Sequence, residues 1–176
     1  MPQNYTPGVQ LKHEVGYYLT LSGGALDGTG VYNWANIGLT ELTGAFNPTT
    51  EETQYIGQSN KTTITTALAP SWSFNCERVG GDPINDDLYE VAISMLTGDI
   101  THQRSFIRVD LKNPHATATG WYSALMATMN VNMENFDQGA PGEKVSLSGT
   151  LAVYGDVQSG WFNITTKAWS VANPPV

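Results

Sequence analysis

The side chains that could take part in catalysis or metal binding are few and scattered along the sequence. His13, His102 and His115 lie far apart without metal-ligand spacing, so we expect surface or hydrogen-bonded histidines. Cys76 alternates with polar residues, which predicts a packed thiol on the dry face of a strand rather than a nucleophile. The sequence lacks the G-x-S-x-G, G-x-x-x-x-G-K and H-E-x-x-H motifs. These observations predict a protein that is not an enzyme and holds neither a metal nor a cofactor.

Two acidic clusters offer the remaining candidate chemistry. Glu51 and Glu52 could imitate the carboxylate pair of a glycosidase, but neighbours in a strand point to opposite faces of the sheet. Asp86 and Asp87 are explained by the positive end of a helix dipole. Together with Asp82 they lack the alternating oxygen ligands and the central glycine of a calcium loop. Neither cluster predicts a catalytic site.

Length and composition narrow the class of protein. The chain has 176 residues, which fits a single domain over 1–176 at roughly 100–200 residues per domain. One cysteine excludes an internal disulfide framework. The net charge of −8 disfavours binding to phosphate backbones. The first residues do not form a signal peptide and no apolar run could span a membrane, so we expect folding in the cytosol.

Strand patterns dominate the elements that must position these residues. Alternation of apolar and polar side chains predicts strands at 15–21, 31–41, 61–68, 71–77, 105–111, 121–133, 145–153 and 161–166. A turn at 155–160 is expected to separate the last two strands. Together these patterns predict a mainly β fold of two packed antiparallel sheets, as a sandwich or barrel.

One helix is expected to flank these sheets, near residues 83–97. Asp82 is placed to cap it, Pro83 suits its first position and Gly98 is expected to end it. An apolar stripe should pack the helix onto a sheet, and its members are Ile84, Leu88, Val91, Ala92 and Met95.

Three segments lie outside these patterns. The polar stretch 43–60 is too long for a hairpin connection, so we expect a long loop that is mobile in the free protein or functional. Residues 1–12 and 167–176 contain prolines and lack strand periodicity, which predicts an extended N-terminal arm and a C-terminal tail. We expect both ends to become ordered against neighbouring subunits.

The order of these features resembles a known family. The segments that carry the likeness are 14–19 (EVGYYL), 106–114 (FIRVDLKNP), 145–156 (VSLSGTLAVYGD) and 160–169 (GWFNITTKAW), with the long loop and the single helix between the first two. In this order they resemble a major tail tube protein of long-tailed, siphovirus-type bacteriophages of Gram-positive bacteria. The resemblance spans roughly residues 15–169 and rests on structural rather than chemical motifs.

The resemblance implies a structural virion protein. Its subunits would form six-membered rings, assembled in the host cytoplasm, that stack into the tail tube through which genomic DNA passes without specific binding. Tape measure, tail completion and distal tail proteins would be its partners, and no membrane would be involved. The long loop would stack the rings through Phe46, Asn47, Pro48, Glu51, Glu52 and Tyr55.

The wall of the channel would be polar and acidic, because attraction between protein and DNA would sum over many rings into a trap. The residues we expect to face the lumen lie on or beside strands with polar faces, and they are Asp110, Thr128, Asn130, Asn132, Glu134 and Asp137.

Two other functions fit the sequence. The same fold could serve as the inner tube of a contractile tail or of a secretion needle. Alternatively, the five tryptophans and eight tyrosines beside Asn and Thr could form the sugar platform of a carbohydrate-binding β-sandwich. Particle size separates these hypotheses, since a tube protein forms rings or filaments.

Overall fold

The computed structural model describes residues 11–35, 37–95, 100–172 and 174. Most of the expected N-terminal arm therefore lies outside the described residues. Within these residues the fold is mainly β with a single α-helix, α1 (Pro83–Ile93), as the sequence predicts. Two short 3-10 turns accompany it, η1 (Lys12–Glu14) and η2 (Ile100–His102). The strands are β1 (Val15–Leu19), β2 (Asn33–Trp34), β3 (Leu39–Ala45), β4 (Pro48–Thr53), β5 (Thr62–Leu68), β6 (Ser71–Glu77), β7 (Gln103–Pro114), β8 (Trp121–Gln138), β9 (Ser146–Asn163) and β10 (Ala168–Ser170).

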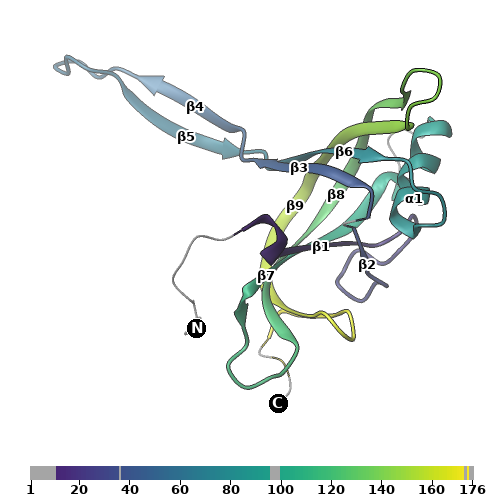
Figure 1. The fold of residues 1–176 in the computed structure, drawn as a ribbon. Helices are drawn as coiled ribbons and strands as arrows, with labels where there is room; N and C mark the ends of the chain where they lie inside the picture. The colour runs from purple at the N-terminus through teal and green to yellow at the C-terminus, as the bar shows by residue number, and fades with distance from the viewer. Residues whose placement is uncertain (1–10, 36, 96–99, 173, 175–176) are drawn as a thin grey trace.

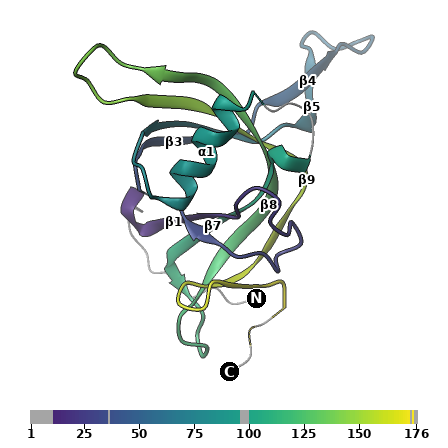
Figure 2. The same ribbon diagram turned by 90° about the vertical axis from the view of Figure 1, so that its right-hand side faces the viewer.

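Most strands belong to one curled antiparallel sheet rather than to two separate packed sheets. Its order is β2-β1-β7-β8-β9-β6-β3, and β10 pairs with β9. The sheet curls around α1, which lies across its hollow (Figure 2). Strands β4 and β5 form a separate two-stranded hairpin that extends away from the rest of the molecule (Figure 1).

The curled sheet buries side chains on both of its faces. The inner face packs against α1 and includes Phe106, Met129 and Val131. Part of the outer face carries a second cluster, in which Ile107 and Phe162 pack with Tyr32 from the segment before β2. Successive residues of β7 therefore enter different cores, which explains why this strand is buried almost throughout.

The expected turn at 155–160 is wrong. Strand β9 continues through this segment to Asn163 and pairs with β8 over its whole length. Between Met126 and Thr128 on β8 the partner strand gains extra residues, where Gly155 adopts a φ of 83°. Glycine and polar residues occur in β-bulges as well as in turns, so the composition of residues 155–160 does not distinguish the two. The chain turns only after Asn163.

The expected C-terminal tail contains structure at its start. Strand β10 pairs with β9, where Trp169 lies opposite Phe162. Trp169 packs against the outer-face cluster. Residues 173, 175 and 176 lie outside the described part of the chain.

The expected long loop at 43–60 is wrong as well. Its first residues complete β3, and β4 then pairs with β5 in the exposed hairpin. All residues of β4 are exposed, so no buried face imposes the apolar alternation by which a strand is recognised in a sequence. Strand β5 agrees with the strand expected at 61–68. The expected strand at 31–41 is divided between β2 and the start of β3.

Helix α1 begins as predicted and ends earlier. The Asp82 side chain caps it by accepting a hydrogen bond from the backbone N–H of Asn85. Ile84, Leu88, Val91 and Ala92 are buried against the sheet. Met95 is not part of this stripe, because it lies beyond the helix with a φ of 47° and is 74% exposed. Gly98 lies outside the described residues.

Candidate functional site

A polar wall covers the part of the sheet formed by β3, β6, β9 and β8, on the face turned away from α1. Directly opposite residues on paired strands share a face, and Thr43, Ser73, Thr150 and Asn132 form such a row across the four strands. The residues between them on the same strands, such as Leu42 and Phe74, belong to the inner core. The polar wall consists of Glu41, Thr43, Ser73, Asn75, Glu77, Thr128, Asn130, Asn132, Glu134, Ser148 and Thr150.

The polar wall is acidic, and two of its carboxylates are held by neutral donors. The Thr150 hydroxyl donates to Glu134 at 2.7 Å. The Asn75 amide donates to Glu41 at 2.9 Å. Glu77 is the exception, because it forms an ion pair with Lys144 at 2.7 Å. Neutral donors fix the carboxylates without cancelling their charge, so the surface stays negative.

The structure brings together four of the six residues expected to line a lumen: Thr128, Asn130, Asn132 and Glu134. Asp110 does not share their face. It lies opposite Val15, which packs in the inner core. Asp137 turns toward the helix, where it accepts a hydrogen bond from the Tyr89 hydroxyl at 3.3 Å. Sequence reasoning missed Glu41 and Glu77, since the register that aligns them with β8 is set by pairing and not by local pattern.

Both sides of the polar wall end in strand edges without a partner strand among the described residues. Strand β3 is the last strand of the sheet. On the other side, β7 pairs with β8 only from Tyr122 to Asn130, so residues 131–138 of β8 have a free edge. A free edge presents unpaired N–H and C=O groups and is a template for pairing with another chain.

The β4–β5 hairpin contains the residues expected to stack rings. Phe46 and Tyr55 are exposed, and the tip adds Ile56, which is fully exposed. Asn47 plays a different part, because its amide donates to Ala69 O at 3.0 Å and to Ser71 Oγ at 2.9 Å and so fixes the base of the hairpin. The other expected residues, Pro48, Glu51 and Glu52, lie on β4 and are exposed. Glu52 forms an ion pair with Lys61 at 3.0 Å.

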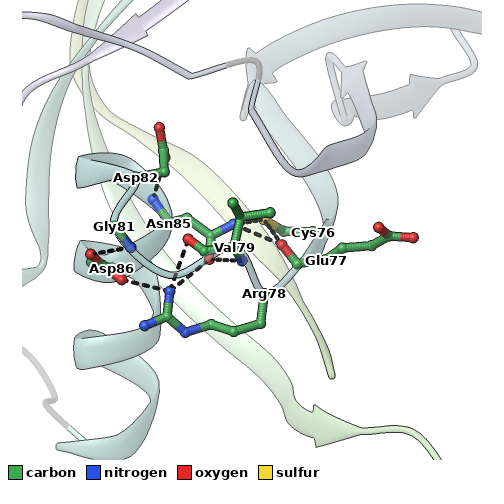
Figure 3. A network of polar contacts seen from close by, with 8 residues as sticks. All are labelled: Cys76, Glu77, Arg78, Val79, Gly81, Asp82, Asn85 and Asp86. Atoms are coloured by element: carbon green, nitrogen blue, oxygen red, sulfur yellow. Dashed lines mark hydrogen bonds and ion pairs between the residues drawn. The ribbon is translucent and has the colours of Figure 1, made fainter. Parts of the chain in front are cut away.

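A buried amide fastens α1 to the end of β6 (Figure 3). The Asn85 Nδ2 group donates to Glu77 O at 2.8 Å and to Cys76 Sγ at 2.9 Å. Its Oδ1 atom accepts from Val79 N at 3.0 Å and from Arg78 Nη1 at 3.2 Å. The helix is therefore held by backbone groups as well as by its apolar stripe.

The pair Asp86 and Asp87 has a structural role beyond the helix dipole. Asp86 forms an ion pair with Arg78 at 2.6 Å. Asp87 forms one with Arg104 at 2.7 Å, and the Arg104 side chain is completely buried. Both aspartates thus fix the helix to its surroundings rather than forming an acid–base couple.

Two further reactive groups, Cys76 and His115, are held in structural environments. Burial raises the pKa of the Cys76 thiol to about 11, so the nucleophilic thiolate is rare at neutral pH. His115 accepts a hydrogen bond from the backbone of Ala118 at 3.1 Å. Within residues 11–35, 37–95, 100–172 and 174, no three His, Cys, Asp or Glu side chains gather as a metal site would require. No helix in these ranges is long and apolar enough to cross a bilayer.

Comparison with known proteins identifies the fold. No protein-family model matches the chain, and no curated protein matches it in sequence. Among solved structures, the tail of an empty gene transfer agent particle, refined with C6 symmetry, matches with a TM-score of 0.57 and 13% identity over 85% of this chain and 98% of that one. The SPP1 tail tube matches with a TM-score of 0.57 and 15% identity over 85% of this chain and 77% of that one. The chain has the tail-tube fold.

The tail-tube fold extends to contractile machines. The sheath/tube terminator of an extracellular contractile injection system matches with a TM-score of 0.50 and 8% identity, over 88% of this chain and 97% of that one. At these identities the likeness establishes the fold, and the polar wall, the free edges and the hairpin are the features of this chain from which a function can be argued.

Proposed function

We propose that the chain is the structural subunit of a phage-type tail tube. Copies form six-membered rings, and the rings stack into a non-contractile tube through which genomic DNA leaves the virion of a phage of Gram-positive bacteria. The rings assemble in the host cytoplasm, with a tape measure protein and tail completion or distal tail proteins as partners. The protein works as a conduit and not as an enzyme. The observation that carries the proposal is the polar wall bounded on both sides by a free strand edge.

The two free edges are complementary in direction and length. Neighbouring strands from β8 through β9 and β6 to β3 are all antiparallel, so β3 of one subunit meets β8 of the next in antiparallel orientation. Strand β3 has 7 residues, and the free part of β8 runs over 131–138. Repeated pairing of unlike edges closes into a ring when the rotation between subunits fits. The polar walls then join into one inner surface.

An inner surface of this composition suits the passage of DNA. Hydroxyl and amide side chains keep the channel wet, and the carboxylates of Glu41 and Glu134 repel phosphates. Phosphate contacts from lysine and arginine dominate the affinity of proteins for DNA, and the one lysine paired to this wall, Lys144, is held by Glu77. The DNA is therefore guided without being bound.

The exposed hairpin supplies contacts between rings. An isolated two-stranded hairpin is marginally stable in water, so one with every strand residue exposed is expected to gain order from a partner. Apolar side chains at its tip, Tyr55 and Ile56, offer anchors for a neighbouring ring.

Electron microscopy combined with cysteine cross-linking tests the proposal. Purified protein should form rings or tubes in negative stain. In a panel of double variants, one cysteine lies on β3 and the other between 131 and 138 of β8. The best-aligned pairs should give a ladder of oligomers that ends at a closed ring. Glu90→Cys with Lys167→Cys, on α1 and in the turn before β10, should give no ladder. A particle that stays monomeric at high concentration, with and without tail initiator proteins, would refute the tube.

An inner tube of a contractile machine is the second candidate, favoured by the likeness to the injection-system terminator. Such a tube must bind a sheath along its outer surface. Assembled tubes that recruit a sheath protein from the same genome would select this function, and bare tubes would select the non-contractile tail.

A further inference from the structure

The curl of the sheet brings the edge of β3 close to β1 and leaves a groove between them, here called the seam. The seam has a volume of about 640 Å³, and its apolar lining is formed by Val15, Tyr17, Leu39 and Leu42. Strands β1 and β3 do not pair with each other in the described part of the chain. The seam is therefore a place where the free edge of β3 stays accessible beside an apolar surface.

Lys12 lies across the seam. Its ammonium group donates to the backbone carbonyl of Leu42 on β3. The same group donates to the Tyr17 hydroxyl on β1 at 3.1 Å and lies 5.1 Å from the centre of the Tyr17 ring. One lysine thus occupies a backbone acceptor of the β3 edge and ties it to β1.

The turn that carries Lys12 is itself held in place by Glu14. The Glu14 carboxylate accepts a hydrogen bond from the backbone N–H of Leu11 at 2.6 Å. It also forms an ion pair with Lys112 of β7 at 3.0 Å. Lys12 is therefore presented by an ordered turn, fastened to the sheet, and not by a free chain end.

We propose that Lys12 is a latch that blocks the β3 edge in the free subunit and must be released before a second copy pairs there. This inference rests on the proposed function, in which β3 receives the free part of β8 from its neighbour. A charged group held against a strand edge obstructs strand addition, because it must lose its partners or be buried before another strand can pair there. The latch slows spontaneous assembly, and an assembling tube end displaces it by supplying many contacts at once.

A graded pair of variants tests the latch. Lys12→Met keeps the length of the side chain and removes the ammonium group. Tyr17→Phe keeps the ring and removes one of the two acceptors. A hydrogen bond from a charged donor contributes roughly one factor of ten to an equilibrium. The critical concentration for unseeded tube formation, measured by light scattering and electron microscopy, should fall roughly tenfold in Lys12→Met. Tyr17→Phe should shift it in the same direction by a smaller factor.

Two further variants serve as controls. Lys12→Arg retains the charge and the donor, so its assembly should stay close to that of the natural protein. Lys167→Asn removes the same charge from the turn before β10, at a position with a φ of 56° that asparagine tolerates. It should not lower the critical concentration. Circular dichroism establishes that each variant is folded, and if Lys12→Met is not, the shift in Tyr17→Phe decides the outcome.

Seeding separates failure of the latch from failure of the tube. Sheared tubes should recruit both the natural subunit and Lys12→Met, the natural subunit at a higher free concentration, because a growing end displaces the latch. If both elongate seeds but have the same unseeded critical concentration, or if Lys167→Asn lowers it as much as Lys12→Met, the latch is wrong and the tube stands. If the natural subunit neither forms tubes nor adds to tube ends grown from tail initiator proteins, the proposed function is wrong. The latch proposal is then wrong as well, because it rests on that function.

Discussion

At the scale of single residues, Asn85 determines how the helix meets the sheet. Its amide is 1% exposed and uses both of its ends, donating to Glu77 O and accepting from Val79 N. Buried backbone groups that lose their partner pay the full cost of desolvation. A residue that only fills the space cannot supply these hydrogen bonds, so replacing Asn85 leaves buried backbone groups without partners.

We expect Asn85→Ala to lower the free energy of unfolding by about 3 kcal/mol, since several buried groups lose their partners. The matched control is Asn135→Ala on β8, beside the polar wall. Asn135 is exposed and donates to Ser148 Oγ at 3.1 Å. The control should change stability by less than about 0.5 kcal/mol. Urea denaturation followed by circular dichroism measures both, and equal losses in the two variants would contradict the role of Asn85.

Cys76 should report on the same junction through pH. Its pKa is raised to about 11 by burial, so the native state holds the thiol proton where an unfolded chain, with a pKa near 9.0, loses it. The contribution of Cys76 to stability is present below pH 9.0 and is lost as the pH rises through about 11. At pH 8 a thiol-specific reagent should label native protein more than about a hundredfold more slowly than protein in denaturant. Rapid labelling of the native protein would contradict this.

At the scale of elements, strands with one buried face can be predicted from the sequence, because burial requires alternating apolar residues. Strands such as β6 and β8 are predictable because the core residues Phe74, Met129 and Val131 alternate with polar residues on the opposite face. Where both faces are exposed, as in β4, there is no such alternation to detect. The bulge at Gly155 was mistaken for a turn because both structures use the same residue types.

The candidate site was predictable within one strand and not across strands. The alternation of Thr128, Asn130 and Asn132 was enough to place them on one face of β8. Whether Asp110 on β7 shares that face depends on the register in which β7 pairs with its neighbours. No local sequence pattern reveals this register.

The hairpin gives a prediction at this scale. Tyr55→Ser with Ile56→Ser should leave the free energy of unfolding within about 0.5 kcal/mol, since both side chains are exposed in the subunit. Tubes should shorten to single rings or short stacks, because the apolar anchors between rings are lost. Val31→Ser with Val171→Ser removes two exposed apolar side chains elsewhere and is the control. Electron microscopy measures tube length, and full-length tubes from the first double variant would rule out the tip as the stacking element.

At the scale of the whole molecule, the charged residues behind the net charge of −8 are unevenly distributed. Glu41, Glu77 and Glu134 meet one lysine on the polar wall, whereas Arg78 and Arg104 are paired with aspartates of α1. In the proposed ring, each charge of the polar wall is repeated around the channel. A single substitution on the wall would therefore change the potential of that channel much more than it changes that of one subunit.

We expect Glu134→Lys to leave tubes intact and to slow or stall DNA ejection, because each ring then attracts phosphate. The effect should be larger at low salt, where screening is weakest. Glu90→Lys makes the same charge change on an exposed position of α1, away from the polar wall, and should eject normally. Ejection kinetics of particles carrying each variant test this. Normal kinetics for Glu134→Lys at low salt would count against an acidic channel while leaving the tube assignment in place.

The order of strands in the sheet also determines when the protein can fold during its synthesis. Strand β1 finds its main partner only when β7 has been made, and β6 must wait for β9, which ends at Asn163. The nascent chain therefore lacks the central strand β9 until synthesis is nearly complete, and the sheet around the apolar stripe of α1 stays open until then. Sheets built from such distant pairings fold in milliseconds to seconds. During that time the apolar surface of the unfinished sheet is exposed to aggregation.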